Sequence, residues 1–380
     1  MRKRFFWIKY LIFSIFFIVI LFLCLESLAR IYLFVRHKEE RYVLDNLPMA
    51  LISENRIFEL KPNYYQKHKS QEFEIDIQTN SNGLRDVEHS ILNQEEAYRI
   101  IALGNSFTFG WGVNQEETWW KILEEQLNNN PDAKYKYEMI NLGVWMYTFD
   151  QQFLRLKDKG LKYNPDLVVH GIYWPHLRTI TNHNWEVDSS GDIKKIYDPT
   201  TYVSAEGLLK SKDTNIFLSF FKNHSKLLNF IISKLQVFFL KDQLITSDLV
   251  FLQEGSIEDY REVWQKTFES IKQTKRLLDQ HGIQYYVFLI PREVQLSENE
   301  WYPLFINYMN EQMYENDIPQ KNFIEFFDEL EISYIDLLPV FRSNYKSSLY
   351  FQMDPHWTKI GHELASEEIF NFLKRESFVK

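Results

Sequence analysis

The sequence predicts an α/β fold, a three-layer sandwich in which helices cover both faces of a mainly parallel sheet. From residue 98 onward, short apolar runs typical of buried strands alternate with amphipathic stretches typical of helices. Such alternation indicates a parallel sheet, because each strand must be followed by a crossover before the next. The composition agrees, since 45% hydrophobic and 25% charged residues are typical of a globular protein and exclude a largely disordered chain.

Five apolar runs are predicted to form the sheet. They carry few charges, as expected for strands that are buried on both faces. The runs are Arg99–Gly104, Tyr137–Gly143, Asp166–Trp174, Gln284–Pro291 and Ser333–Asp336. Ligands bind at the carboxyl ends of parallel strands, so the loops after Leu103, Leu142 and Tyr173 are the predicted site.

Amphipathic segments between and after these runs predict the covering helices. Thr148 is suited to be an N-cap, because its hydroxyl can accept a bond from a backbone N–H of the first turn. The expected helices are Glu116–Leu127, Thr148 through Lys159, a helix within Glu258–Gln280, helical stretches between Glu298 and Leu330, and a last helix near Lys359–Lys374.

The first 40 residues differ in charge from the remainder. They carry a net charge of +4, which leaves −13 on the rest of the chain. The stretch from Tyr10 to Leu25 is uncharged, and with Lys9 snorkelling to the interface the apolar span covers about residues 5–25. The basic residues before it predict a cytoplasmic N-terminus. We therefore expect a single-pass protein of the cytoplasmic membrane, with residues 1–40 as anchor and the main domain extracytoplasmic.

Two other uses of this segment are weaker. Ser27-Leu28-Ala29 offers small residues for signal-peptide cleavage, but the long apolar run and Glu26 count against a cleaved peptide. A lipoprotein is disfavoured because Phe22-Leu23, before Cys24, are too large for the usual attachment site. Cys24 is the only cysteine, so intramolecular disulfides and cysteine metal clusters are excluded.

Residues 41–97 are predicted to form a stalk and a small β-rich module. Glu72–Thr79 alternates polar and apolar residues as a half-buried strand does, and the following turn favours a positive φ at Gly83. Arg85 fits a structural salt bridge better than a substrate contact. Residues 98–380 form the main α/β domain.

An insertion of about residues 179–257 interrupts this domain. Within it, residues 215–240 are rich in Phe, Leu and Ile and carry three lysines. This pattern favours an amphipathic helix that packs a cap onto the core, with a lid or a membrane-surface segment as the alternatives.

Three polar residues supply a nucleophile, a base and an orienting acid. Ser106 directly follows a buried strand and enters a helix, so its Oγ can be exposed and its N–H free. Asp354 stands two residues before His356, where an acid can orient and polarise the imidazole of a general base. The loop is neither a Gly-x-Ser-x-Gly elbow, because position 108 is Thr, nor a phosphate-binding P-loop.

The remaining histidines fit structural roles. His362 lies near a helix start among apolar residues and His170 lies inside an apolar strand, so both are expected to be packed in the core. His176, His183 and Asp188 share no regular spacing, which favours surface polar residues over metal ligands. We expect no metal and no cofactor.

Three segments in this order resemble the blocks of the SGNH (GDSL-like) hydrolase superfamily. GNSFTFG (104–110) is similar to block I, with Asn105 where Asp is commoner, and INLGVWMYTFDQQ (140–152) is similar to block II. DPHWTKIGH (354–362) is similar to block V, in the Asp-x-His-Trp form of SGNH-like acetyltransferases of exported polysaccharides.

The resemblance covers residues 98–178 and 258–374. TNSNGLRD (79–86) and the anchor resemble membrane-anchored members of the superfamily. The resemblance implies an SGNH-hydrolase or flavodoxin-like fold with Ser106, Asp354 and His356 as the catalytic residues.

The oxyanion hole departs from the family pattern. The backbone N–H groups of Ser106 and Gly143 are its expected donors. Where the family places Asn-Asp, this chain has Trp174-Pro175-His176, and Pro175 has no backbone N–H. His176 is a candidate replacement for the asparagine. Loss of one donor typically costs about 10²–10³ in rate, so the third block permits a weak enzyme or an inactive one.

Two functions follow from the resemblance. The first is a membrane-anchored extracytoplasmic serine esterase or O-acyltransferase that acts on acyl esters, acetyl first among them, of a cell-envelope glycan or on a small acyl ester. An acyl-donor protein in the membrane is then a further partner to expect. The alternative is a catalytically weak or inactive protein of this fold that binds a glycan or takes part in assembly.

Composition adds expectations about the substrate. Of 63 aromatic residues, 53 lie outside the first 40 residues, so the anchor does not explain the 17% aromatic content. Asn105, Trp174 and Trp357 are candidate substrate-binding residues, although aromatic core packing explains the tryptophans equally well. The negative ectodomain argues against nucleic acid and favours neutral or cationic glycans.

Overall fold

The computed structural model describes most of the chain. The described residues are 10, 13–17, 20–28, 48–93, 96–199, 201–204, 208–211, 225, 249–252, 255–296, 317–352 and 354–378. The chain divides into two compact units, Met1–Val43 with Lys212–Leu244, and Leu44–Ser211 with Ile245–Lys380.

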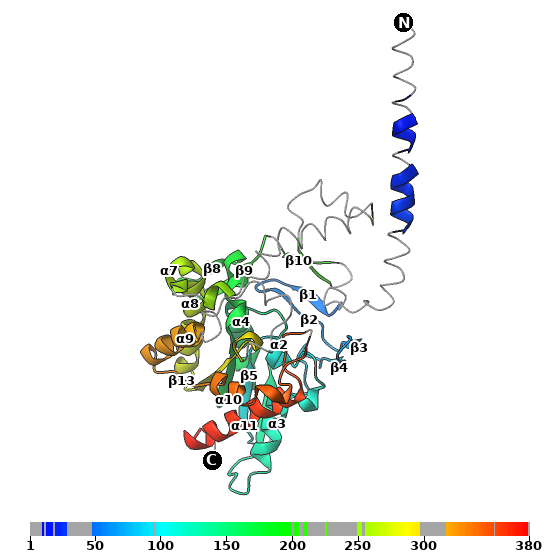
Figure 1. Cartoon of the computed structure of the whole chain (residues 1–380). Coiled ribbons are helices and arrows are strands. Elements are labelled where there is room, and N and C mark those ends of the chain that lie inside the picture. Colours follow the sequence, from blue (N-terminus) through cyan, green and yellow to red (C-terminus); the bar gives the residue numbers. More distant parts are fainter. Residues whose placement is uncertain are drawn as a thin grey trace. The chain divides into compact units, whose positions relative to one another are not determined.

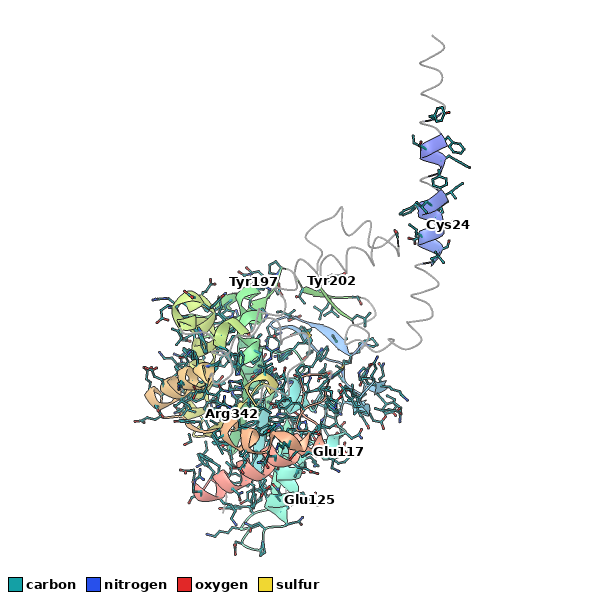
Figure 2. All side chains as sticks on the ribbon, in the orientation of Figure 1. Cys24, Glu117, Glu125, Tyr197, Tyr202 and Arg342 are labelled. Atoms are coloured by element: carbon teal, nitrogen blue, oxygen red, sulfur yellow. The ribbon has the colours of Figure 1, made fainter. Side chains whose placement is uncertain are left out.

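In the first unit, residues 13–17 and 20–28 are helical, and Figure 2 shows the exposed Cys24 on this helix. Among the described residues, none of the helices is long and apolar enough to cross a membrane. The predicted span of about residues 5–25 lies partly outside the described residues and stays a prediction. Apart from Ser225, the predicted amphipathic segment 215–240 lies outside them altogether.

The second unit is built on a five-stranded parallel sheet, as predicted (Figure 1). Its strands are β5 (Tyr98–Leu103), β6 (Tyr137–Asn141), β7 (Leu167–Tyr173), β12 (Gln284–Ile290) and β13 (Ser333–Asp336). Their spatial order is β13-β12-β7-β5-β6, and every neighbouring pair is parallel. This is the flavodoxin-like order, whose direction of strand addition reverses between β5 and β7.

Helices cover both faces of the sheet and give three layers, which confirms the predicted fold class. Along β5, Ile100 and Ala102 pack into one apolar cluster and Ile101 and Leu103 into the other. The first cluster includes residues of α3 (Trp119–Asn128), α10 (Leu338–Ser343) and α11 (Lys359–Arg375). The second includes residues of α4 (Phe149–Asp158), α8 (Arg261–Gln280) and α9 (Ile318–Glu329).

The predicted helix start at Thr148 is confirmed. Thr148 has an extended backbone and forms a capping box with Gln151, whose side chain accepts the Thr148 N–H at 3.1 Å. Of the helical stretches predicted between residues 298 and 330, the structure describes α9, and residues 297–316 lie outside the described part of the chain.

The N-terminal β-rich module packs in the same compact unit as the sheet. It consists of two antiparallel hairpins, β1 (Ala50–Ser53) with β2 (Ile57–Leu60), and β3 (Tyr65–Lys69) with β4 (Glu74–Gln78). The Tyr147 hydroxyl donates to the Phe58 carbonyl at 2.5 Å and so ties this module to the loop before α4. Gly83 has φ +70°, as expected, and a Cβ there would lie 2.6 Å from the Leu60 carbonyl oxygen.

The insertion contributes two further hairpins. Short helical turns connect the larger elements of the unit. The insertion hairpins are β8 (Asn184–Val187) with β9 (Ile193–Tyr197), and β10 (Thr201–Val203) with β11 (Leu209–Ser211). The short turns are α2 (Ser106–Phe109), η2 (Gln115–Glu117), η3 (Gly160–Tyr163), η4 (Trp174–Asn182), η5 (Leu249–Leu252), α7 (Ser256–Asp259), η6 (Glu293–Gln295) and η9 (Tyr345–Ser347).

Two histidines are buried in this core, as the sequence predicts. His170 on β7 lies between the Tyr285 hydroxyl, 2.7 Å from Nδ1, and the Gln152 Oε1, 2.6 Å from Nε2. Nε2 therefore carries the proton and Nδ1 accepts from the tyrosine. His362 on α11 accepts the Trp119 backbone N–H at Nδ1, at 3.1 Å. Burial lowers the pKa of both imidazoles to about 3.

These histidines make the protein acid-sensitive. Because the folded-state pKa lies below the unfolded value near 6.5, the unfolded chain takes up the proton first as pH falls. The stabilisation is complete above about pH 6.5 and is lost toward about pH 3, at about 1.4 kcal/mol per pH unit for each histidine. His170→Gln should therefore flatten the fall of the unfolding free energy, measured in urea between pH 7 and 4.5. The exposed His281→Gln is the control, and an equal slope for His170→Gln and wild type would contradict the account.

Candidate active site

The loop after β5 presents Ser106 as the first residue of α2, at the switch point of the sheet. The Asn105 side chain caps this short helix by accepting the Phe107 N–H at 3.1 Å. Ser106 is 6% exposed, and its backbone N–H has no hydrogen-bond partner among the described residues. The turn therefore presents both a hydroxyl and a free N–H at the carboxyl edge of the sheet.

Ser106, His356 and Asp354 form one hydrogen-bonded chain. The Ser106 Oγ lies 2.7 Å from His356 Nε2, and His356 Nδ1 bonds to Asp354 Oδ1. The His356 backbone N–H donates to the same carboxylate oxygen at 3.1 Å. Residues 250 positions apart in sequence thus meet in the order that a nucleophile, a base and an orienting acid require.

The charge on Asp354 sets the tautomer of His356. Burial alone would raise the pKa of the Asp354 carboxyl, but hydrogen bonds from His356 and Trp111 outweigh it and lower the pKa below the usual 3.8. The carboxylate can only accept, so Nδ1 carries the proton. Nε2 then has a free lone pair that accepts the Ser106 O–H, as a general base needs.

Aromatic rings surround this chain of hydrogen bonds. The Phe107 ring lies 4.9 Å from the His356 imidazole, between centroids, and the Trp111 ring lies 6.3 Å from it. Trp111 also donates its indole N–H to Asp354 Oδ2 at 3.0 Å. This contact joins residues 243 positions apart, so no local pattern in the sequence indicates it.

The structure changes the expectation for Gly143. Its N–H donates to the Asn141 Oδ1 at 2.8 Å, so it is not free to receive an oxyanion. Gly143 instead has a steric role, since a Cβ there would lie 2.3 Å from the Phe109 backbone nitrogen. In the same turn, the N–H groups of Trp145 and Met146 have no hydrogen-bond partner among the described residues. Met146 is 47% exposed and has φ +62°.

The candidate substrate-binding residues are buried, which for the two tryptophans favours the alternative of core packing. Asn105 is buried as a helix cap, Trp174 is 2% exposed and Trp357 is 0% exposed. The Trp174 indole donates to Gln295 Oε1 at 3.0 Å, and Trp357 packs edge-on against Phe107 at 5.0 Å. None of these rings is open to stack on a sugar.

Trp174-Pro175-His176, which stand in the place of the family's block III, follow β7 as predicted and begin the 3-10 helix η4. Pro175 occupies the first turn of this helix, where a missing N–H is tolerated. The side chain of His176 lies outside the described part of the structure, so its role stays a prediction.

Arg85 makes no ion pair among the described residues, unlike the predicted salt bridge. It is 1% exposed and donates to backbone carbonyls of Phe109 at 2.9 Å and Val113 at 2.8 Å, and also to that of Gly110. Burial lowers its pKa to about 10. The next residue, Asp86, accepts the Asn141 backbone N–H at 2.8 Å. These two side chains thus hold both loops of the site.

Glu293 is a site residue that the sequence analysis missed. It follows β12 at the carboxyl edge of the sheet, and burial raises the pKa of its carboxyl, opposed by the neighbouring Arg292 and, more weakly, by His356. Its Oε2 is buried without a hydrogen-bond partner among the described residues. The sequence feature that could have pointed to Glu293 is its position directly after the predicted strand 284–291.

His183 is buried, which corrects its expected place on the surface. Its Nδ1 lies 2.8 Å from Asp150 Oδ2, and the Trp185 indole donates to the same oxygen at 2.7 Å. Asp188 instead accepts from the backbone and side chain of Ser190. In the part of the chain that the structure describes, no three His, Cys, Asp or Glu residues are grouped as metal ligands would be.

The fold and the site define an α/β protein with a serine, histidine and aspartate triad at the switch point of a flavodoxin-like sheet. Residues 250–380 match the family described as "SGNH hydrolase-like domain, acetyltransferase AlgX". This match, which includes residues 354–362, agrees with the predicted resemblance to SGNH hydrolases over this part of the chain. A comparison with curated proteins finds no match.

Several solved structures are similar at low identity. The esterase EstA from Pseudoalteromonas sp. shares 13% identity over 73% of this chain and 97% of its own, with a TM-score of 0.37. A lipase/acylhydrolase from Enterococcus faecalis shares 14% over 74% and 97%, with 0.38. A catalytic mutant of Axe2, an acetylxylan esterase from Geobacillus stearothermophilus, shares 9% over 74% and 96%, with 0.41. The fold assignment rests on the strand order, not on these likenesses.

The close approach at Gly143 gives a testable consequence. Gly143→Ala places a methyl group 2.3 Å from the Phe109 nitrogen and 2.6 Å from the Thr108 carbonyl carbon, both of them backbone atoms. We expect a loss of about 2–4 kcal/mol in the unfolding free energy, measured in urea. Gly282→Ala is the control, because its Cβ meets nothing within 4 Å and only φ +66° costs energy, about 1 kcal/mol. Equal losses for the two variants would contradict the steric role.

Proposed function

We propose that this protein is a serine-dependent acyl-ester enzyme in which Ser106 is the nucleophile, His356 the general base and Asp354 the residue that orients His356. The observation that carries the proposal is the 2.7 Å contact between the Ser106 Oγ and His356 Nε2. A serine hydroxyl is a weak nucleophile until a base accepts its proton. A protein that only binds a ligand has no need of this arrangement.

The proposed reaction is covalent acyl transfer. As the Ser106 Oγ attacks the ester carbonyl, its proton moves to His356 Nε2, and the imidazolium is stabilised by the Asp354 carboxylate. The alcohol leaves with the proton from His356, and the acyl group stays on Ser106. Water or a sugar hydroxyl then attacks the acyl-enzyme and loses its proton to His356. The bond between Ser106 Oγ and the acyl carbon breaks, His356 returns the proton to Oγ, and the acyl group leaves as the acid or the new ester.

The developing oxyanion needs donors other than Gly143. The free N–H of Ser106 is the first, because it belongs to the nucleophile itself. The turn of Trp145 and Met146 supplies the second, since its N–H groups are unpaired within the described residues and the turn lies between β6 and α4. Donors held in place before the reaction contribute several kcal/mol to lowering the barrier, so this turn replaces the missing asparagine of block III.

We further propose that the substrate is an acyl ester, acetyl first among the candidates, of a cell-envelope glycan. Two features support it: the family matched by residues 250–380 is described as an acetyltransferase, and the −13 charge outside the first 40 residues favours a neutral or cationic glycan. Transfer between glycans would need an acyl donor, for which a membrane protein is the proposed partner.

We also propose that the N-terminal segment anchors the protein in the membrane. Residues 5–25 would cross the cytoplasmic membrane, with the basic N-terminus in the cytoplasm and the α/β unit outside. The alternative function, an inactive glycan-binding or assembly protein, is favoured only by the departure in block III. The hydrogen-bonded triad favours the enzyme.

Catalysis by the triad predicts a large loss of activity. Ser106→Ala and His356→Ala should each lower p-nitrophenyl acetate turnover by the full-length chain by about 10³-fold or more, because neither leaves an activated nucleophile. A fluorophosphonate probe should label wild type at Ser106, found by peptide mass spectrometry. Ser343→Ala, an exposed serine on α10, is the control. Unchanged turnover in Ser106→Ala would remove the proposed function.

Anchoring predicts how the protein fractionates. The full-length chain should stay with membranes after an alkaline carbonate wash, and a chain lacking residues 1–28 should move to the supernatant, because a spanning helix is held by apolar burial that high pH does not weaken. A matched deletion of residues 215–240 tests the membrane-surface alternative. If the protein left the membrane only when residues 215–240 were deleted, residues 1–28 would not be its membrane anchor.

A further inference from the structure

The triad carboxylate is held at both oxygens. Asp354 Oδ1 accepts from the His356 side chain and backbone, while Oδ2 accepts the Trp111 indole N–H at 3.0 Å. The terminal torsion of an aspartate is soft, so a carboxylate that is bonded at one oxygen alone can rotate away from the imidazole. The second bond removes that freedom. It also acts on a partly buried, charged acceptor, and hydrogen bonds to charged groups are stronger than those between neutral groups.

Trp111 is itself fixed by the N-terminal β-rich module. Its ring is buried, 4.9 Å from the His68 ring on β3 and 6.0 Å from the Phe73 ring before β4, between centroids. Phe73 also lies 5.0 Å from Phe351, which belongs to the loop that carries Asp354. The module therefore contacts Trp111 itself and the loop that carries its hydrogen-bond acceptor, Asp354.

The backbone around Trp111 would be loose without further support. Gly110 and Gly112 flank it with φ of +86° and +90°, and the segment forms no strand. The Arg85 guanidinium supplies the support by donating to the Phe109 and Val113 carbonyls on either side, and to the Asp76 carbonyl at 3.1 Å. The guanidinium also donates to the Gly110 carbonyl. One cation thus binds both ends of the segment that bears Trp111.

Burying Arg85 without a carboxylate partner is costly, which argues that its position matters. A buried charge normally requires an ion pair or several hydrogen bonds, and here carbonyl oxygens take that place. Simple loop packing would need neither a cation nor an indole N–H directed at Asp354.

We propose that Trp111 is a positioning residue of the triad, which holds Asp354 in register with His356, and that Arg85 positions Trp111. The inference rests on the proposed function, since it assigns these residues to the same catalytic triad. It also explains why Arg85, in the TNSNGLRD segment, donates to carbonyls of the loop that follows the nucleophile helix.

The test removes the indole N–H of Trp111 and keeps the rest of the site. Trp111→Phe keeps an aromatic ring between His68 and Phe73 but cannot donate to Asp354. We expect kcat for p-nitrophenyl acetate to fall about 10-fold with KM changed less than about twofold, because the lost bond matters most when the imidazolium forms. The rate of fluorophosphonate labelling at Ser106 should fall in parallel. Arg85→Lys, which cannot span both ends of the segment, should show the same pattern.

The chain offers matched controls for both variants. Trp185→Phe removes an indole bond to Asp150, whose Oδ2 also pairs with a histidine, His183. Arg99→Lys alters a similarly buried arginine that binds the Ile91, Tyr163 and Ser90 carbonyls at the opposite end of β5 and, unlike Arg85, also pairs with Glu138 at 2.7 Å. Both controls should lower the melting temperature and leave kcat within about twofold of wild type.

The outcomes separate this inference from the proposed function. If Ser106→Ala is inactive while Trp111→Phe keeps wild-type kcat, the positioning role fails and the triad stands. If kcat follows the melting temperature equally in Trp111→Phe and Trp185→Phe, the effect is one of stability and the inference also fails. If wild type and Ser106→Ala turn over substrate equally, the proposed function fails and takes the inference with it.

Discussion

Two consecutive buried ions hold the loops on which the whole site depends. Arg85 binds carbonyls of the loop after the nucleophile helix, and Asp86 accepts the Asn141 N–H at the end of β6. Leaving a buried backbone group unpaired costs about 1–3 kcal/mol, so these bonds decide where the two loops lie. Asn141 extends the link, since its side chain donates to the Arg85 carbonyl and accepts the Gly143 N–H. The N-terminal module is thereby part of the site's scaffold.

The sheet topology explains why this scaffold is needed. At the switch point, the connections after β5 and β7 lead to opposite faces, and the loops there have no neighbouring strand to fix them. Ser106 is held from one side by the cap of Asn105 and by the close approach of Gly143 to Phe109. His356 comes from a loop near the C-terminus. Only contacts between these loops can set a hydrogen bond of 2.7 Å, and aromatic packing around Phe107 provides many of them.

The sequence predicted the parts that depend on local pattern. Strand Ser333–Asp336 has the predicted bounds, Thr148 caps α4, and Ser106 and His356 were found because each follows or precedes a regular element. It did not predict contacts between loops. Trp111 and Asp354 are 243 positions apart, and no periodicity encodes that an indole N–H will meet a carboxylate. Burial of Trp357 was equally hidden, since an aromatic residue beside a site motif suits a cleft and a core alike.

The oxyanion hole is where tertiary contacts override the family pattern. Gly143 was expected to donate its N–H, but its lack of a Cβ is needed for contact with Phe109, and its N–H is taken by Asn141. The turn continues to Met146, a non-glycine residue at φ +62°. Such a conformation costs about 1–3 kcal/mol and persists only when its surroundings impose it. Here the Gly143 contact fixes one end of the turn and the Thr148 capping box the other. The strain therefore accompanies an N–H that has no partner among the described residues, which is what an oxyanion donor must offer.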